Sequence, residues 1–87
     1  MNTIKLTHPI TVDGVSYTEL NIRRSKVKDR LAVSSMQGSN EQKEIHLFAN
    51  LCNVSPDVIK ELDEMDYIKI QKAYMAFFDL TATSDEK

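Results

Sequence analysis

The sequence predicts a small α+β protein in which an N-terminal β-hairpin precedes three to four short amphipathic helices. Three observations support this fold class: an alternating strand pattern around an Asp-Gly turn, repeated helix start signals, and apolar side chains at helical spacing in the second half. The chain has 87 residues, so we expect a single small domain over residues 1–80. The polar residues 81–87 are expected to form a disordered tail.

The β-hairpin is predicted over residues 3–23. Apolar residues alternate with mostly polar ones over residues 4–12, which is the period of a half-buried strand. Asp13 and Gly14 follow, and they are typical of a two-residue hairpin turn because both of its central positions adopt positive φ. An isolated hairpin is only marginally stable, so its apolar face must pack on the helices or on another chain.

The second strand cannot continue the register of this turn without a break. An uninterrupted ladder would leave Leu20 and Ile22 on the solvent face. One extra residue in this strand would place Leu20 opposite His8 and Ile22 opposite Leu6. We therefore predict a β-bulge near Thr18–Glu19.

Helices are predicted at residues 26–35, 41–52, 56–62 and 64–80. Each one follows a residue whose side chain can accept a hydrogen bond from a free amide of the first turn. Asn53 tolerates a left-handed backbone and is expected to end the second helix. The expected capping residues are Ser25, Ser39 or Asn40, Ser55 and Asp63.

The sequence contains no arrangement of residues that indicates catalysis or a metal site. The single cysteine, Cys52, rules out an internal disulfide and agrees with a reducing compartment. His8 and His46 lie on different predicted elements, and both glycines are isolated, so neither a ligand set nor a phosphate loop results. Acids are dense at two helix starts, where capping and the helix dipole explain them. We therefore expect no enzyme activity, no metal and no cofactor. The acids are Asp57, Glu61, Asp63, Glu64 and Asp66.

Charge is unevenly distributed along the chain, although the net charge is only −2. Residues 1–38 hold six Lys/Arg and three Asp/Glu, a balance of +3, whereas residues 39–87 hold five and ten, a balance of −5. A basic cluster in the first part could bind an acidic partner or phosphate, or could simply face solvent. The cluster consists of Arg23, Arg24, Lys26, Lys28 and Arg30.

A helix-turn-helix is an alternative for residues 49–59, because a small residue, a turn residue and apolar residues stand at similar spacing in DNA-binding helix pairs. The exposed side of its second helix would be mostly acidic and would face a polyanion, so we expect no nucleic-acid partner. We also find no signal-peptide pattern and no apolar run of about 18 residues, so we expect a cytoplasmic protein without a membrane partner.

Short motifs follow one another in a defined order over residues 4–78. They are Pro9-Ile10 with Val12-Asp13-Gly14, then Tyr17-x-x-Leu20-x-Ile22-Arg23-Arg24, Leu47-x-x-x-Leu51-x-Asn53-Val54-Ser55 and Leu62-x-x-x-Asp66-Tyr67, before an aromatic-rich helix. This order resembles the tail assembly chaperones of Mu-like and related contractile-tailed phages. Ser25 stands where many members have proline, and Asn53 replaces a turn glycine.

The resemblance implies binding to the tape-measure protein, a long helical protein that exposes apolar stripes until tube subunits enclose it. Such chaperones keep this client soluble during tail-tube assembly and then leave, so the chain is expected in the host cytoplasm and not in the mature virion. A structural tail component is the alternative. Open hairpin edges and the small core also leave room for a homo-oligomer.

Two groups of residues are candidates for contact with that client. The first is the broad apolar face of the last predicted helix, and the second is the basic cluster, which would steer an acidic partner. An aromatic stripe at helical spacing is usually core, but a domain this small cannot bury every large side chain. Ile70, Tyr74 and Phe77 are better explained as core residues, and the other candidates are better explained as contacts with the client. The apolar candidates are Tyr67, Ile70, Tyr74, Met75, Phe77 and Phe78.

Overall fold

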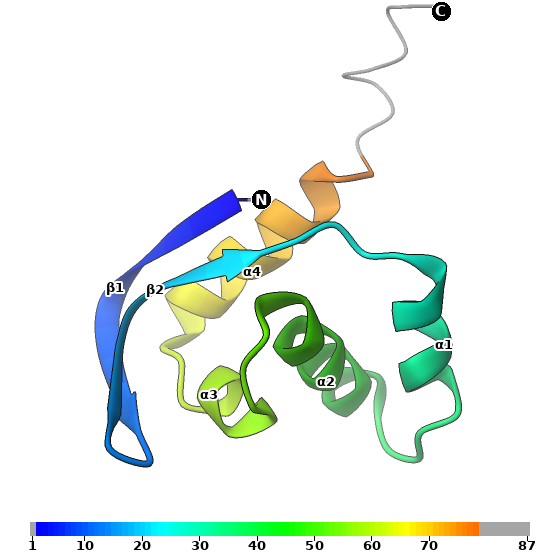
Figure 1. Cartoon of the computed structure of the whole chain (residues 1–87), viewed down its shortest axis with the longest axis horizontal. Helices are drawn as coiled ribbons and strands as arrows, with labels where there is room; N and C mark the ends of the chain where they lie inside the picture. Colours follow the sequence, from blue (N-terminus) through cyan, green and yellow to red (C-terminus); the bar gives the residue numbers. More distant parts are fainter. Residues whose placement is uncertain (1, 79–87) are drawn as a thin grey trace, which may run out of the picture.

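The computed structural model describes residues 2–78, which form an antiparallel β-hairpin followed by four helices (Figure 1). This confirms the predicted α+β fold class. The predicted tail and the last residues of the predicted helix at 64–80 lie outside the described residues. The elements are β1 (Asn2–Val12), β2 (Val15–Ile22), α1 (Val27–Ser34), α2 (Asn40–Cys52), α3 (Pro56–Lys60) and α4 (Glu64–Ala76).

The hairpin turn forms at the Asp-Gly pair, as its positive φ requirement predicts. Asp13 has a φ of 51° and Gly14 a φ of 78°, and Val12 pairs with Val15 across the turn. The hairpin packs against α4, α2 and α3. Figure 1 shows the two strands curving along one side of these helices, with the chain then crossing to α1.

The β-bulge lies in a different strand from the one that the sequence predicted. Between the pairs Lys5–Glu19 and Ile10–Tyr17, β1 has four residues and β2 has only one. The extra residues therefore belong to β1, and the prediction of a bulge in β2 near Thr18–Glu19 is wrong.

The observed register still turns the apolar residues of both strands to one side. Leu20 lies opposite Ile4 and Ile22 lies opposite Asn2, and the three apolar residues among these four are buried. The bulge forms in β1 because two of its amides donate to a carboxylate of α4. No register pattern within the hairpin could reveal that distant partner.

Local chemistry sets the ends of the two long helices. Ser39 caps α2, because its hydroxyl accepts a hydrogen bond from the Gln42 amide at 3.1 Å. Asp63 caps α4 by accepting from the Met65 amide at 2.9 Å. Asn53 ends α2 in the left-handed conformation, with a φ of 58°. These three assignments confirm the sequence-based predictions.

Helix α1 differs from the prediction at its start. It begins after Lys26, and Asp29 rather than Ser25 supplies the capping oxygen, which accepts from the Lys26 amide at 2.8 Å. Val27 and Leu31 are 75% and 63% exposed. The helix packs mainly on α2, and these two apolar side chains face solvent.

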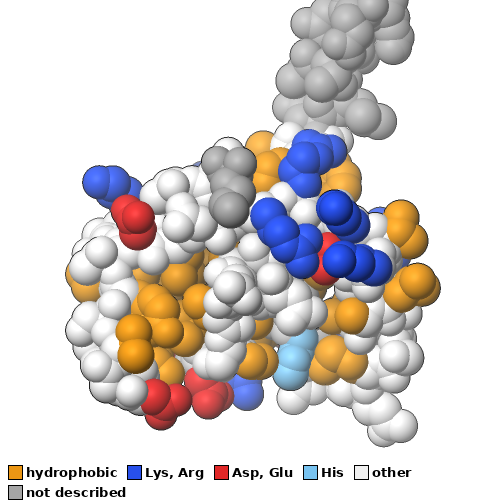
Figure 2. Space-filling model, in the orientation of Figure 1, with side chains coloured by type: hydrophobic (Ala, Val, Ile, Leu, Met, Phe, Trp, Pro, Cys, Tyr) orange, Lys and Arg blue, Asp and Glu red, His pale blue; other side chains and the backbone are white. Residues whose placement is uncertain are grey.

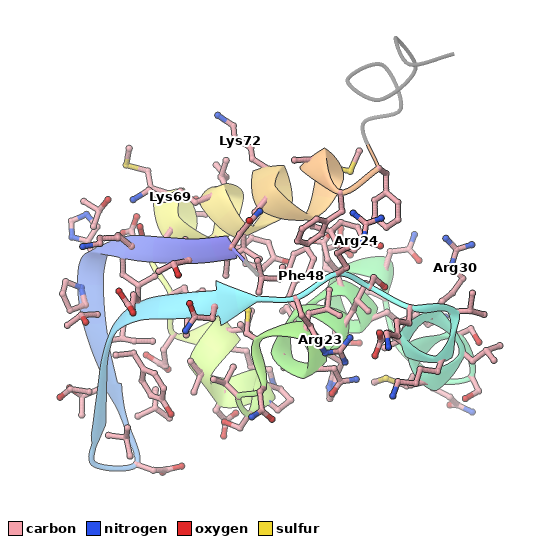
Figure 3. The ribbon with its side chains drawn as sticks, turned by 45° about the horizontal axis from the view of Figure 1, so that its top comes forward. Arg23, Arg24, Arg30, Phe48, Lys69 and Lys72 are labelled. Atoms are coloured by element: carbon pink, nitrogen blue, oxygen red, sulfur yellow. The ribbon has the colours of Figure 1, made fainter. Side chains whose placement is uncertain are left out.

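The core lies where the hairpin, α2, α3 and α4 meet. Phe48 of α2 is completely buried, and Figure 3 shows it between α2 and α4. The buried side chains around it come from the hairpin and from three helices, so no pair of elements is sufficient to enclose the core. They include Ile4, Leu6, Leu20, Ile22, Leu51, Val58, Ile59 and Ile70.

Candidate partner-binding surface

Helix α4 is anchored to the hairpin by the buried carboxylate of Asp66. Its oxygens accept hydrogen bonds from the amides of Thr7 at 2.8 Å and His8 at 3.0 Å, and the Lys69 ammonium lies 3.2 Å away. Burial alone would raise the pKa of Asp66, but these contacts hold it below its usual value. The sequence analysis explained Asp66 only as one of the acids at a helix start. It did not predict that Asp66 fixes the hairpin.

One face of α4, the inner face, packs into the protein. Ile70 is completely buried, and the Tyr74 ring makes an edge contact with Phe48 at 5.3 Å between centroids. The Tyr67 hydroxyl donates to the Glu44 carboxylate. Burial, together with this hydrogen bond, raises the pKa of Tyr67. The inner face therefore supplies core and a fixed contact with α2.

The opposite face of α4 leaves large apolar side chains exposed to solvent. Met65 is 62% exposed, Ile68 43% and Met75 63%. Together with the exposed Lys72, these residues form a stripe that we call the outer seam. An open groove of about 660 Å³ runs beside it, and its lining residues are Ile68, Gln71, Lys72, Met75, Ala76 and Phe78.

The six apolar residues predicted from the sequence to contact a partner differ in how exposed they are. Met75 and Phe78 are exposed and line the groove. Ile70 is in the core and presents no surface to a partner. The remaining residues are half-buried, so each offers only part of its surface. They are Tyr67, Tyr74 and Phe77.

The candidates chosen from the sequence did not include Met65 or Ile68. The signal that could have found them is the spacing of Met65, Ile68 and Met75, which share one side of a helix. Lys72 interrupts that stripe, so the aromatic side chains of the opposite face form the more obvious apolar pattern.

The basic cluster divides into cations with partners and cations that face solvent. Arg23 donates to the two oxygens of Asp29 at 2.8 and 2.9 Å, which holds the pKa of Asp29 well below its usual range and raises that of Arg23. Arg24 lies 5.4 Å from the centroid of the Phe77 ring. Figure 2 shows blue side chains gathered at the end of the molecule that carries α1. The other exposed cations are Lys26, Lys28 and Arg30.

A second groove joins this cluster to the outer seam. Its volume is about 250 Å³, and Lys26, Val27 and Arg30 line it together with Phe78. Phe78 lines both grooves. Among the described residues that line them, the only charged side chains are Lys26, Arg30 and Lys72. The combined surface is therefore apolar and basic.

Other chemistry in residues 2–78 is limited. No group of three or more His, Cys, Asp or Glu side chains in this range could hold a metal ion. Burial raises the pKa of Cys52 to about 11, so its thiol is protonated at neutral pH. None of the described helices has both the length and the apolar character that crossing a membrane requires.

Helix α3 does not resemble the recognition helix of the helix-turn-helix alternative. It ends at Lys60 and has five residues, fewer than the predicted 56–62. Val58 and Ile59 are buried in the core. The exposed side chains near them are Asp57, Lys60 and Glu61, so an acidic majority would face the phosphates of DNA.

The chain matches a protein family over nearly its whole length. The match covers residues 3–79, and the family is described as "Phage tail assembly chaperone proteins, E, or 41 or 14". The comparisons with curated proteins and with solved structures gave no match. The matched range includes the hairpin, the Asp66 anchor and the outer seam. The chain therefore belongs to the phage tail assembly chaperone family.

Proposed function

We propose that this protein binds the tape-measure protein and keeps it soluble while the tail tube assembles. Membership of the family supports a role in tail assembly. The observation that carries the proposal is the outer seam, where Met65, Ile68 and Met75 stand exposed on a helix whose other face already forms core. Large apolar side chains grouped on one exposed face are often found at interaction sites.

The chemistry of the seam suits a helical client with apolar stripes. A helix can lie in a groove and insert apolar side chains at intervals of three and four residues. Met65 and Met75 have unbranched, polarizable side chains that adapt to irregular surfaces. Each contact would be weak because the groove is small, so many copies bound along one client would provide retention.

Co-expression tests this proposal directly. A tape-measure protein expressed with the wild-type chain should remain in the soluble fraction, whereas Ile68→Ser combined with Met75→Ser should leave most of it in the pellet. The control is Val15→Ser at the hairpin turn, because Val15 is also an exposed apolar residue, at 51%, but lies outside both grooves. Circular dichroism should be unchanged in all variants. A double variant that still keeps the client soluble would exclude the seam as its binding surface.

The proposed location is the host cytoplasm during assembly. A chaperone that leaves the client before the tube closes should be absent from purified particles, whereas a structural tail component should be present in a fixed ratio to the tube protein. Mass spectrometry of purified virions separates these alternatives. Stoichiometric recovery of this chain from particles would replace the chaperone role with the structural one.

A further inference from the structure

The outer seam has the residue spacing of one helix of a coiled coil. Met65, Ile68, Lys72 and Met75 follow one another at intervals of three, four and three residues, which are the a and d positions of a heptad. All four are exposed, whereas Ile70 between them is buried on the inner face. A lysine therefore occupies one core position of an otherwise apolar seam.

Lys72 has no hydrogen-bond or ion-pair partner within residues 2–78. Figure 3 shows its side chain extending away from the body of the protein. Lys69 differs, because its ammonium contacts Asp66 and the Thr7 hydroxyl. A partner helix that covered the seam would surround Lys72 with apolar side chains. Its charge would then be left unpaired unless the partner supplied an acid.

The adjoining groove carries charge of the same sign. Lys26 and Arg30 line it, and Phe78 lines both grooves. No acid lines either groove within the described residues, although the chain has 13 Asp and Glu against 11 Lys and Arg. This charge distribution favours an acidic partner over a neutral or basic one.

We propose that the outer seam binds an amphipathic helix of the client that places an acidic residue at the core position opposite Lys72. The inference rests on the proposed function for the existence of a client, and it adds the chemistry of the bound segment. That segment has apolar residues at heptad spacing, one Asp or Glu in the apolar stripe, and further acids toward Lys26 and Arg30. A single charged core position fixes register, so the pair would set where each copy binds along the client.

A helix fits this site because α4 presents a straight seam. The helix has 13 residues, about 20 Å at the helical rise, which accommodates a partner with anchors at i, i+3 and i+7.

Two synthetic peptides test the inference with the full-length protein. Each has about three heptads with Leu at the core positions, except that one central core residue is Glu in the first peptide and Lys in the second. Isothermal titration should show that the wild type binds the Glu peptide at least about tenfold more tightly than the Lys peptide. Lys72→Glu should invert this preference, and Lys72→Gln should abolish it. The control Lys60→Glu changes an exposed lysine of α3 outside both grooves and should leave the preference intact.

Several outcomes would overturn the inference. Equal affinity for both peptides, or a preference that Lys72→Glu leaves unchanged, excludes the Lys72 pairing. Peptide binding that appears only after residues 79–87 are removed would make that acidic segment the occupant. Concentration-dependent dimers that resist competition by the Glu peptide would make it a second copy, and co-sedimentation with anionic vesicles would make it a lipid surface. If the double Ser variant loses the tape-measure protein but Lys72→Glu retains it, the proposed function stands and this inference fails.

Discussion

Helix α4 has two apolar faces with different surroundings, and Ile70 and Ile68 represent them. Ile70 is completely buried, whereas Ile68, two residues earlier, is 43% exposed. A helix that is apolar all round normally lies inside a protein on every side. Here the hairpin, together with Phe48 and Glu44 of α2, covers one face only. The comparison teaches that the apolar surface left over after the core is built, rather than amphipathicity, identifies the candidate binding face.

The largest expected effect contrasts these two isoleucines. Ile70→Ala should lower the free energy of unfolding by about 2–5 kcal/mol, because it leaves a cavity in a packed core. Ile68→Ala should change it by less than about 0.5 kcal/mol, because the side chain is half in solvent already. Urea denaturation of both variants measures the difference. Similar losses in the two variants would mean that Ile68 is also part of the core.

The sequence could select α4 as the candidate binding helix, but it could not predict which of its faces is exposed. Both stripes are visible in the residue pattern, and the aromatic one was selected because its side chains are larger. Which stripe becomes core depends on the partners that other elements bring, above all Phe48 of α2. Ile70 and Tyr74 meet that ring or its neighbours, and Met65 does not. Periodicity alone carries no information about those partners.

A smaller loss is expected at the anchor that orients the inner face. Asp66→Ala should lower the free energy of unfolding by about 1–3 kcal/mol, because the amides of Thr7 and His8 would lose their hydrogen-bond acceptor in a part-buried site. The control Asp57→Ala removes an exposed acid and should have a smaller effect. Equal effects in thermal unfolding would show that Asp66 acts only as a first-turn acid of α4.

The buried acids also predict a direction of pH dependence. The pKa values of Asp29 and Asp66 in the folded protein lie below the usual value, so the unfolded chain takes up protons first as the pH falls. The free energy of unfolding should therefore be fully developed near neutral pH and should decrease below about pH 4. Denaturation at several pH values measures this, and Asp66→Asn should show a smaller decrease over the same range. A stability that rises on acidification would contradict the assigned pKa directions.

Two errors in the predicted fold, the bulge and the start of α1, have different physical origins. The hairpin turn and the caps at Ser39 and Asp63 depend on neighbouring residues, and the sequence located them correctly. The bulge depends on Asp66, which is nearly sixty residues from Thr7 along the chain. The start of α1 depends on Asp29. Arg23, which directly follows β2, donates hydrogen bonds to the carboxylate of Asp29. A contact between distant segments therefore decided the position of the bulge, whereas side chains three to six residues apart decided the start of α1.

The smallest expected effect concerns the contact between the basic cluster and the end of α4. Arg24 stands over the ring of Phe77, and an exposed cation–π contact contributes about 0.5–1 kcal/mol. Arg24→Gln should lower the free energy of unfolding by that amount, whereas Arg30→Gln should leave it unchanged because no described ring lies beneath Arg30. The affinity for the acidic peptide should show the opposite order. Arg30→Gln should weaken binding more than Arg24→Gln does, since Arg30 lines the groove and Arg24 does not. Loss of stability in Arg30→Gln, or loss of peptide binding in Arg24→Gln alone, would show that the cluster is not divided between a structural and a binding part.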